Sequence, residues 1–470
     1  MTLLEVFNKG ITKLRNLTII RLLLICSLLF SSVTETVEID TGSAISIRNT
    51  SSAIASSIMA FYPPYKGIDA AIGVFPRPHY WWQAGAVWGA IIDYWAFVGD
   101  DRYNELISEA LLSQTGPYNN YMPPAMFAEL GNDDQAFWGF AVLEAAERKF
   151  PDPPSSGPQW LELGQAVFNT MAVEWDDATC SGGIRWQKFA FNNGYSYKNT
   201  VSNGGFFLIG ARLARYTKNE TYAEWATKTW DWTARVGLLD SNTYAVYDGL
   251  HIGNGNCDSF DYLQWTYNIG SYMAGAAYMY SFTTLPVWRE RAQRLFEHIK
   301  QTFFFNGIMF EAACETVGTC STDSRSFKAY LCRYLGMTAD LVPELRAEIQ
   351  ALMQTNAAAV ARSCVEGSNG LECGQKWTMQ AFDGVTSLGE CQCALEAVLN
   401  TVRFVDSNVG LPADVNTGTS QGNPGAGLSK GGEADWSMRN STRGDRAFAW
   451  ILTISVMACL SVSTWWVLSG

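Results

Sequence analysis

Two kinds of helical segment alternate between about Ser46 and Arg403, and this alternation is the strongest constraint on the fold. One kind is amphipathic, with charged residues on one face. The other is apolar almost all round and rich in Gly, Ala and aromatic residues. Since a helix that is apolar on every side has to be buried, the second kind is expected inside and the first kind outside. Strand-like alternation is scarce, so the sequence predicts an all-α chain.

The expected inner helices begin about 50 to 70 residues apart, which indicates a long-period repeat of helical hairpins. We expect inner helices at 81–98, 134–146, 203–215, 261–282, 327–337 and 388–402, and outer helices at 46–61, 102–112, 160–173, 222–236, 288–303 and 343–360. An open stack would leave apolar faces at both ends, whereas a closed ring buries them. The sequence therefore predicts an (α/α)6 toroid of six helical hairpins, with an irregular helical array as the alternative.

The two ends of the chain read as targeting segments around a main domain. Residues 1–32 have basic residues before the apolar run 22–30 and small residues after it, which is typical of a secretory signal. Residues 33–405 form the helical domain, and the Gly-, Asn- and Ser-rich residues 406–440 are predicted to be a flexible stalk. We therefore expect a secreted protein.

The C-terminal segment 441–470 is hydrophobic and carries no charge after Arg446. A membrane-spanning anchor is usually followed by basic residues, whereas a signal for a glycosylphosphatidylinositol (GPI) anchor is not. We expect a GPI-attachment signal, with Asn440 or Gly431 and Gly432 near the attachment point, and a single transmembrane anchor as the alternative. The protein would then lie at the outer face of the plasma membrane or in the cell wall.

Cysteine usage agrees with export. Nine cysteines remain when those of the signal and the tail are left out, and Cys314 with Cys320 and Cys364 with Cys373 are the pairs most suited to local disulfides. With only 3 histidines, none at ligand spacing to a cysteine pair, no metal site and no cofactor is expected. The net charge of -12 and the lack of a basic run argue against a nucleic-acid partner.

Three adjacent carboxylate pairs are candidates for chemistry: Asp100-Asp101, Asp133-Asp134 and Asp176-Asp177. Each could simply cap a helix or brace a turn. The second pair differs because it opens an inner helix, and in a closed ring one set of inner-helix ends faces a shared central basin. Asp133 and Asp134 are therefore the candidate catalytic pair.

Two carboxyl groups are what glycoside cleavage commonly requires. They lie about 5 to 5.5 Å apart when one forms a covalent sugar intermediate, and farther apart when a water must fit between them. Neighbouring Cα atoms are only about 3.8 Å apart, so adjacent aspartates suit the shorter separation. Mutual repulsion should leave one carboxyl ionised and the other protonated.

The chain resembles glycoside hydrolase family 76, the α-1,6-mannanases, and more closely its fungal, GPI-anchored cell-wall branch. The resemblance rests on ordered blocks at 132–135, 137–138, 182–186, 197–200, 203–204, 247–249, 266–268 and 326–331. The family implies an (α/α)6 fold and a retaining mechanism, with Asp133 as nucleophile and Asp134 as general acid/base. As substrate contacts we predict Trp81, Trp82, Arg185, Asn199, Asn203, Tyr267, Asn268 and Lys328.

For the fungal branch, the resemblance implies an enzyme that cuts the mannose-containing GPI glycan and transfers the protein-linked remnant to a wall β-glucan. Retaining chemistry permits this, because a sugar hydroxyl can open the covalent intermediate in place of water. The alternatives are a hydrolytic endo-α-1,6-mannanase and a non-catalytic mannan-binding wall protein. The expected partners are therefore an α-mannose-containing glycan, a wall glucan and the plasma membrane.

Overall fold

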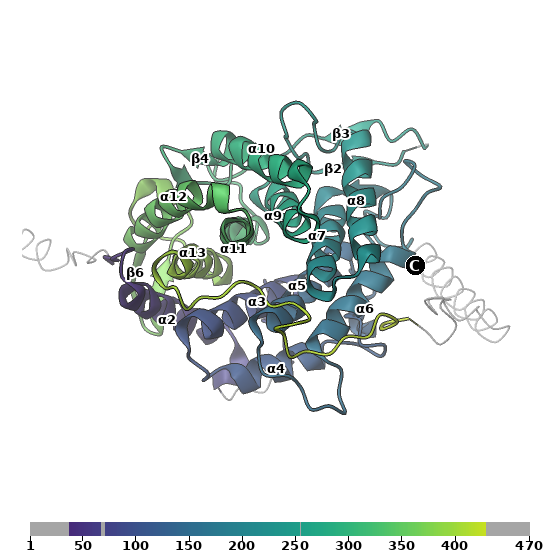
Figure 1. The fold of residues 1–470 in the computed structure, drawn as a ribbon. Coiled ribbons are helices and arrows are strands. Elements are labelled where there is room, and N and C mark those ends of the chain that lie inside the picture. The colour runs from purple at the N-terminus through teal and green to yellow at the C-terminus, as the bar shows by residue number, and fades with distance from the viewer. Residues whose placement is uncertain (1–36, 67–70, 254, 429–470) are drawn as a thin grey trace, which may run out of the picture.

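The computed structural model describes residues 37–66, 71–253 and 255–428, and within them the helices form two concentric rings (Figure 1). The predicted signal 1–32, the tail 441–470 and residues 429–440 of the predicted stalk lie outside the described residues. No helix of the described residues is long and apolar enough to cross a membrane.

The inner ring is closed. Each inner helix contacts the next, and the last contacts the first. In chain order the inner helices are α3 (Trp81–Val98), α5 (Asn132–Arg148), α7 (Thr200–Thr217), α9 (Thr266–Thr283), α11 (Phe327–Leu341) and α13 (Leu388–Leu399). The outer helices pack around them and are α2 (Ala44–Ala60), α4 (Asn104–Ser113), α6 (Trp160–Val173), α8 (Glu220–Arg235), α10 (Pro286–Phe303) and α12 (Pro343–Arg362). The predicted (α/α)6 toroid is thus confirmed.

Two predicted helix bounds are wrong for a local reason. The inner helix expected from residue 261 begins only at Thr266, because Ser259–Asp261 is strand β3. It pairs with β2 (Gly249–His251), which pairs with β1 (Tyr197–Asn199). The helix expected to end at residue 402 ends at Leu399, and the short α14 (Val402–Val405) follows. Short hairpins β4 (Phe304–Phe305) with β5 (Ile308–Met309), and β6 (Cys364–Gly367) with β7 (Gly370–Cys373), join other helices.

Glycine lets the inner helices approach one another closely. A Cβ on Gly275 of α9 would lie 2.3 Å from the ring of Phe207 on α7, and one on Gly204 of α7 would lie 2.5 Å from Ser271 on α9. Large rings fill the gaps between helices: Trp138 lies between Trp81 and Tyr121, with ring centroids 5.1 and 5.3 Å away. The surplus of Gly and aromatic residues in the sequence is therefore explained largely by the core.

A buried network of charges joins all six inner helices; we call it the girdle. Arg148 on α5 donates to Asp93 on α3, Arg212 on α7 to Glu144 and Glu147 on α5, and Arg333 on α11 to Glu396 on α13. Tyr278 on α9 completes the set by donating to Glu147 at 2.7 Å. Its members lie at the middle of α11 or in the C-terminal halves of the other inner helices, so the girdle is away from the helix starts where the predicted basin is expected.

Residues 406–428 pack along the molecule rather than forming a free stalk, and we call this segment the strap (Figure 1, yellow). Its carbonyl groups at Pro412 and Ala413 accept hydrogen bonds from Arg215, and the N–H of Ala413 donates to the carbonyl of Glu147. The prediction of a flexible stalk is therefore wrong for these residues. A composition rich in Gly and Asn indicates a mobile segment, but here side chains of the helices form hydrogen bonds with its backbone.

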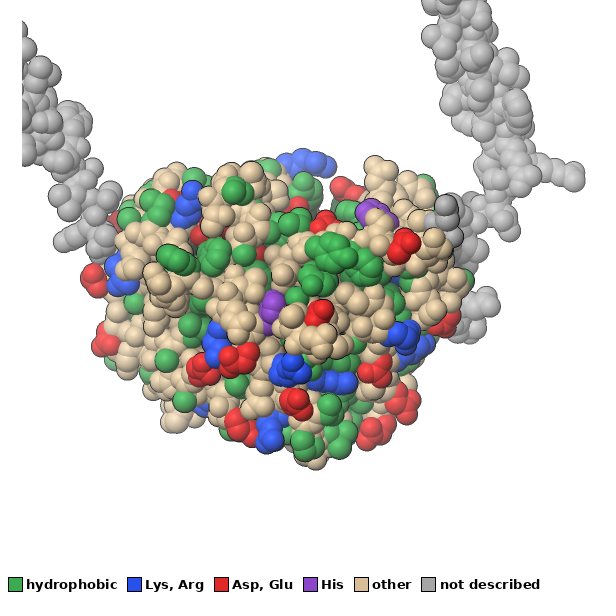
Figure 2. Space-filling view, turned by 90° about the horizontal axis from the view of Figure 1, so that it is seen from above, with side chains coloured by type: hydrophobic (Ala, Val, Ile, Leu, Met, Phe, Trp, Pro, Cys, Tyr) green, Lys and Arg blue, Asp and Glu red, His purple; other side chains and the backbone are tan. Residues whose placement is uncertain are grey.

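Three disulfides join described cysteines. Cys314–Cys320 and Cys364–Cys373 confirm the two predicted local bridges, and Cys180–Cys257 links segments far apart in the sequence. Cys332, Cys391 and Cys393 are buried free thiols. On the flank that carries α10, acidic and basic side chains are interspersed, and hydrophobic side chains gather near β2 and β3, where Tyr262 and Leu263 are exposed (Figure 2).

Candidate active site

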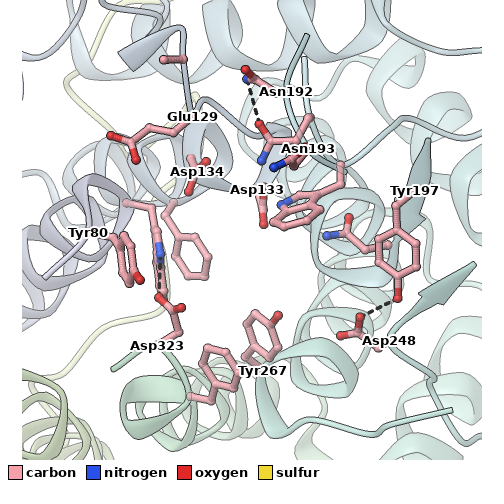
Figure 3. A pocket seen from close by; sticks show the side chains of 17 residues that line it. Tyr80, Glu129, Asp133, Asp134, Asn192, Asn193, Tyr197, Asp248, Tyr267 and Asp323 are labelled. Carbon is pink, nitrogen blue, oxygen red and sulfur yellow. Dashed lines mark hydrogen bonds between the residues drawn. The ribbon is translucent and has the colours of Figure 1, made fainter. Parts of the chain in front are cut away.

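A cavity of about 550 Å³ opens at the N-terminal ends of the inner helices. Its walls come from the start of α3, the start of α5, the loop before β1, the turn before β2, and the starts of α9 and α11. Figure 3 shows the acidic pair Asp133 and Asp134 on one side of this cavity, facing Tyr267 and Asp323 across it. The basin expected at one end of the inner ring is therefore present.

Asp133 and Asp134 converge on Gly131, two residues before Asp133, because glycine has no side chain to occupy the space that the two carboxyls share. A Cβ on Gly131 would lie 2.2 Å from Oδ1 of Asp133 and 2.9 Å from Oδ2 of Asp134. The two oxygens thus cannot be farther apart than the sum of these distances. That limit agrees with the separation of about 5 to 5.5 Å typical of retaining glycosidases.

Hydrogen bonds between buried side chains fix the position of the start of α5. Asn132 donates from Nδ2 to Glu174 at 2.7 Å and to the carbonyl of Arg185 at 3.0 Å. The buried ammonium of Lys188 donates to Oδ1 of Asn132 at 2.7 Å and to Glu174 at 2.6 Å. Asp134 itself accepts from the backbone N–H of Gly131 at 2.6 Å. The catalytic candidates therefore stand at a helix start that Asn132, Glu174 and Lys188 hold in place.

Burial dominates the electrostatics of the pair. Burial, and next the charge of Asp134, raise the pKa of Asp133 well above its usual range. Burial raises the pKa of Asp134 to about 7, opposed by the N–H of Gly131 and by Lys188 and reinforced by the charges of Asp323 and Glu129. Because two ionised carboxylates this close repel one another, the pair holds at least one proton near neutral pH.

Two further carboxyl groups complete an acidic lining. Asp323 accepts from the indole N–H of Trp82 at 3.2 Å, and burial raises its pKa to about 6. Asp248 accepts from the hydroxyl of Tyr197 at 2.7 Å, and burial raises its pKa as well. Sugar hydroxyls and amines are the groups that such carboxylates bind.

Three predicted substrate contacts line the cavity: Trp82, Asn199 and Tyr267. The ring of Trp82 packs on Phe137, and that of Tyr267 stacks on Phe327 at 3.8 Å between centroids, so both rings are held in place. Trp81 lines only a smaller adjoining pocket, where its N–H donates to Gln114. Whether these residues touch a sugar stays a prediction.

Four other predicted contacts do not line the cavity, and each has a structural partner instead. Arg185 pairs with Asp176 at 2.7 Å, and Lys328 pairs with Glu315 at 2.9 Å beneath the ring of Trp377. Asn203 bonds the backbone of Ile184 in both directions, and Asn268 donates to Asp248 at 3.5 Å. These four are therefore not among the residues of the cavity wall, and their contact with a sugar stays a prediction.

Sequence reasoning missed several lining residues. Asp248, Tyr197 and Trp186 belong to blocks that carry the family resemblance, so a signal for them existed. Asp323 and Asn193 come from irregular loops whose position depends on tertiary structure. A single acid in such a loop gives no periodic or paired pattern that points to a site.

Comparison with known proteins identifies close relatives. The family model described as glycosyl hydrolase family 76 matches residues 46–408. The mannan endo-1,6-alpha-mannosidase DCW1 of Candida glabrata is 46% identical over 427 residues, which cover 90% of this chain and 94% of the relative. That of Saccharomyces cerevisiae is 46% identical over 431 residues, covering 91% and 95%.

Solved structures show the same fold. Dfg5 from Chaetomium thermophilum, solved in complex with glucosamine, superposes with a TM-score of 0.78 at 40% identity and covers 83% of this chain and 97% of that one. An inactive variant of a Salegentibacter α-1,6-mannanase, with two consecutive aspartates replaced by asparagine, was solved with α-1,6-mannotriose. It superposes with a TM-score of 0.62 at 18% identity and covers 77% and 100%.

Proposed function

This chain belongs to glycosyl hydrolase family 76, a family of glycoside hydrolases, and we propose that it cleaves α-1,6-mannosidic bonds through Asp133 and Asp134. The observation that carries the proposal is the convergence of both carboxyls on Gly131 at the cavity wall. Relatives named for the same activity, and a mannanase of the same fold that is inactive when two consecutive aspartates are replaced, support it.

The proposed reaction uses the pair in two roles. Asp133 attacks C1 of the mannose and forms a glycosyl ester, while Asp134 gives its proton to the departing oxygen. Asp134 then takes a proton from the acceptor hydroxyl that opens the ester. Burial raises the pKa of both carboxyls, so these roles require that the proton kept by the pair lie on Asp134 and that Asp133 be ionised. A pKa of about 7 lets Asp134 act as an acid in the first step and as a base in the second.

The test separates the two roles. Asp133→Asn and Asp134→Asn should each lower kcat/KM on an α-1,6-mannooligosaccharide by at least roughly a hundredfold. On an aryl mannoside whose leaving group needs no proton, only the Asp134→Asn variant should regain glycosylation. If both variants kept full activity, the proposal would be wrong; binding without turnover by the wild type would favour the mannan-binding alternative.

For the donor, we propose a GPI glycan rather than plain mannan. Its core contains mannose next to a glucosamine whose free amine is cationic. The acidic lining of Asp248, Asp323 and Glu129 suits such an amine, and the relative from Chaetomium thermophilum was solved with glucosamine. The predicted signal and tail would bring the enzyme to the outer face of the plasma membrane, where such donors lie.

For the acceptor, we propose a wall β-glucan held at the cavity rim. Phe189 stacks on Phe191 with ring centroids 5.3 Å apart, and Phe127 packs on Phe189 at a tilt with centroids 4.9 Å apart. Phe191 is 60% exposed and directly precedes Asn192 and Asn193, which line the cavity. Exposed rings beside a sugar site can stack on a second sugar chain and favour it over water.

Adding β-glucan oligosaccharides to the enzyme and a mannoside donor distinguishes transfer from hydrolysis. Transfer products would support the proposal, whereas new reducing ends alone would favour the hydrolytic mannanase. Phe191→Ala should lower the ratio of transfer to hydrolysis while leaving hydrolysis intact. Phe305→Ala, which removes an equally exposed ring far along the chain, is the matched control and should leave the ratio unchanged.

A further inference from the structure

The strap carries the chain from the girdle end of the toroid to the cavity end. It starts near the C-terminal ends of the inner helices, where Asp406 pairs with Arg48 and Arg48 donates to the carbonyl of Phe97 at 2.8 Å. It then meets the backbone of Glu147 and Tyr216, at the ends of α5 and α7. These contacts all lie at the face opposite the catalytic pair.

From there the strap climbs the outer helix α6. Leu161 at the start of α6 donates its N–H to Ser420 at 3.0 Å, and Gln165 one turn on accepts from the N–H of Asn423 at 2.6 Å. Asn169, a further turn on, donates to the carbonyls of Pro424 and Ala426 at 2.9 Å. Each step of the strap moves one helical turn, about 5.4 Å, along α6.

The climb ends beside the active site. The carbonyl of Gly427 accepts from Asn120 at 3.3 Å, and the carbonyl of Asn120 accepts from Gln135 at 2.5 Å. Gln135 directly follows Asp134 in α5. The last described part of the chain is thus two hydrogen bonds from the residue next to the catalytic pair.

Small residues allow the strap to seat. A Cβ on Gly427 would lie 2.7 Å from Ala166, one on Gly422 would lie 2.7 Å from Gln165, and one on Gly418 would lie 2.0 Å from the hydroxyl of Tyr216. The glycines of the strap therefore allow its backbone to pack closely against the helices, and they do not indicate mobility.

We propose that the strap turns the cavity toward the membrane, so that the enzyme acts on glycans of lipid-anchored donors close to the bilayer. The inference rests on the proposed anchor and donor. From Gly427 to an attachment point near Asn440 the chain can bridge at most roughly 45 Å. If the tail left the domain at the strap's first residues instead, it would start on the opposite face. That face is about 26 Å away along the inner helices, the length of the 17-residue helix α5.

The orientation can be measured on the full chain in isolated cell membranes. A thiol-reactive dye is attached to Phe191→Cys at the cavity rim or to Ile45→Cys, an exposed position at the start of α2 on the girdle side, and energy transfer to a dye-labelled lipid is recorded. The free thiols among the described residues are buried, and the unsubstituted protein measures the labelling background of the whole chain. Stronger transfer from position 191 is expected; equal transfer, stronger transfer from position 45, or a chain that does not stay with the membrane overturns the inference.

Two strap variants test the cause. Deleting residues 414–427 makes the tail leave from the girdle face and should reverse the order of energy transfer. Turnover of a lipid-linked mannoside in the same membrane should fall roughly tenfold, because the cavity would then face away from the membrane-bound donor. Turnover of a soluble mannoside should stay unchanged. Replacing 414–427 by a Gly/Ser segment of equal length should abolish the preference for position 191; a wild-type preference would overturn the role of the strap contacts.

The two proposals fail in different ways. If the unsubstituted chain does not turn over any soluble mannoside, the proposed function is refuted, but the comparison of energy transfer from positions 191 and 45 remains a separate result. Normal soluble turnover with no orientation preference refutes only the inference drawn from the strap.

Discussion

At the scale of single residues, Gly131 decides whether the two aspartates can work together. Its φ of -93° is open to any residue, so an alanine there meets no backbone strain. Its Cβ would, however, lie 2.2 Å from Asp133 Oδ1, which forces that carboxyl to move. The position is therefore constrained by the space that the carboxyls need.

Gly131→Ala is expected to leave the fold intact and to lower kcat/KM by roughly a hundredfold, since a displacement of about 1 Å in a reacting group has that effect. Gly157→Ala is the matched control, because its Cβ would meet nothing closer than 3.5 Å. Circular dichroism and kinetics on a mannoside check both variants. Full activity of Gly131→Ala would show that the observed convergence is not required.

The pH profile should report Asp134. Its raised pKa of about 7 keeps the proton on Asp134 below that pH, so the activity that needs this proton should fall as the pH rises through about 7. Asp323→Asn removes a negative charge and should move this alkaline limb to lower pH, by up to about one unit. Lys188→Met removes a positive charge and should move it to higher pH.

The kcat/KM profile of each variant, normalised to its own maximum, checks the opposite signs. Asp231→Asn, on the exposed face of α8, should leave the limb in place. Shifts of the same sign in both variants would contradict the assignment of the limb to Asp134.

At this scale the sequence predicted that Asp133 and Asp134 face the cavity, but it predicted only part of their surroundings. Adjacent acids at the start of an inner helix form a pattern that depends on local structure alone. The exclusion of Arg185 and Lys328 from the cavity depends on Asp176 and Glu315, which the chain brings near them only on folding. Predictions of substrate contact for long, positively charged side chains such as Arg185 and Lys328 were therefore the least reliable.

At the scale of elements, glycine spacing sets how closely the inner helices pack. Gly275→Ala places a Cβ 2.3 Å from the ring of Phe207, which stacks on Tyr272 and Trp288, so the ring has little room to yield. Overpacking of this kind costs about 1 to 3 kcal/mol, more than the roughly 1 kcal/mol that alanine gains over glycine in a helix. The variant should unfold at a lower temperature than the wild type.

Gly205→Ala on α7 is the comparison, because its Cβ would lie 3.0 Å from the Cβ of Ala136 and 3.6 Å from the ring of Phe140. Its melting temperature should stay close to that of the wild type, since the contact is milder and the helix preference offsets it. Thermal unfolding followed by circular dichroism measures both. Equal melting temperatures for the two variants would contradict the packing argument.

The elements themselves were predictable where periodicity is long and strong. The inner helix expected at 81–98 matches α3, and the outer helices expected at 160–173 and 343–360 match α6 and most of α12. The start of α9 was misjudged because Ser259–Asp261 pairs with a strand formed ten residues earlier. The strap was misjudged because its order comes from side chains of α6 and α7.

At the scale of the whole molecule, the girdle ties the ring together. Arg333 lies between Glu396 and Asp93, with the nearest atoms of Arg333 and Asp93 3.6 Å apart, and all three side chains are almost fully buried. Removing the cation leaves buried carboxyls without a partner, which typically costs about 3 to 5 kcal/mol. No pattern in the sequence shows this network, because its members are spread over all inner helices.

Arg333→Met should therefore lower the melting temperature by several degrees, whereas Arg289→Met, which breaks an exposed pair with Glu344, should leave the melting temperature close to that of the wild type. Adding Glu396→Leu to Arg333→Met should recover part of the loss, since it removes one stranded charge. Denaturant unfolding measures the three variants. If the double variant had a clearly lower free energy of unfolding than Arg333→Met alone, Arg333 and Glu396 would not stabilise the protein through their mutual interaction.

Because the ring closes where α13 meets α2 and α3, the fold has a seam between the first and last parts of the domain. The apolar flank of α3 that α13 covers stays uncovered until nearly all of the domain has been synthesised. The growing chain would thus expose a large apolar surface for most of its translation, and its folding should depend on chaperones that bind the early hairpins until the last one is synthesised.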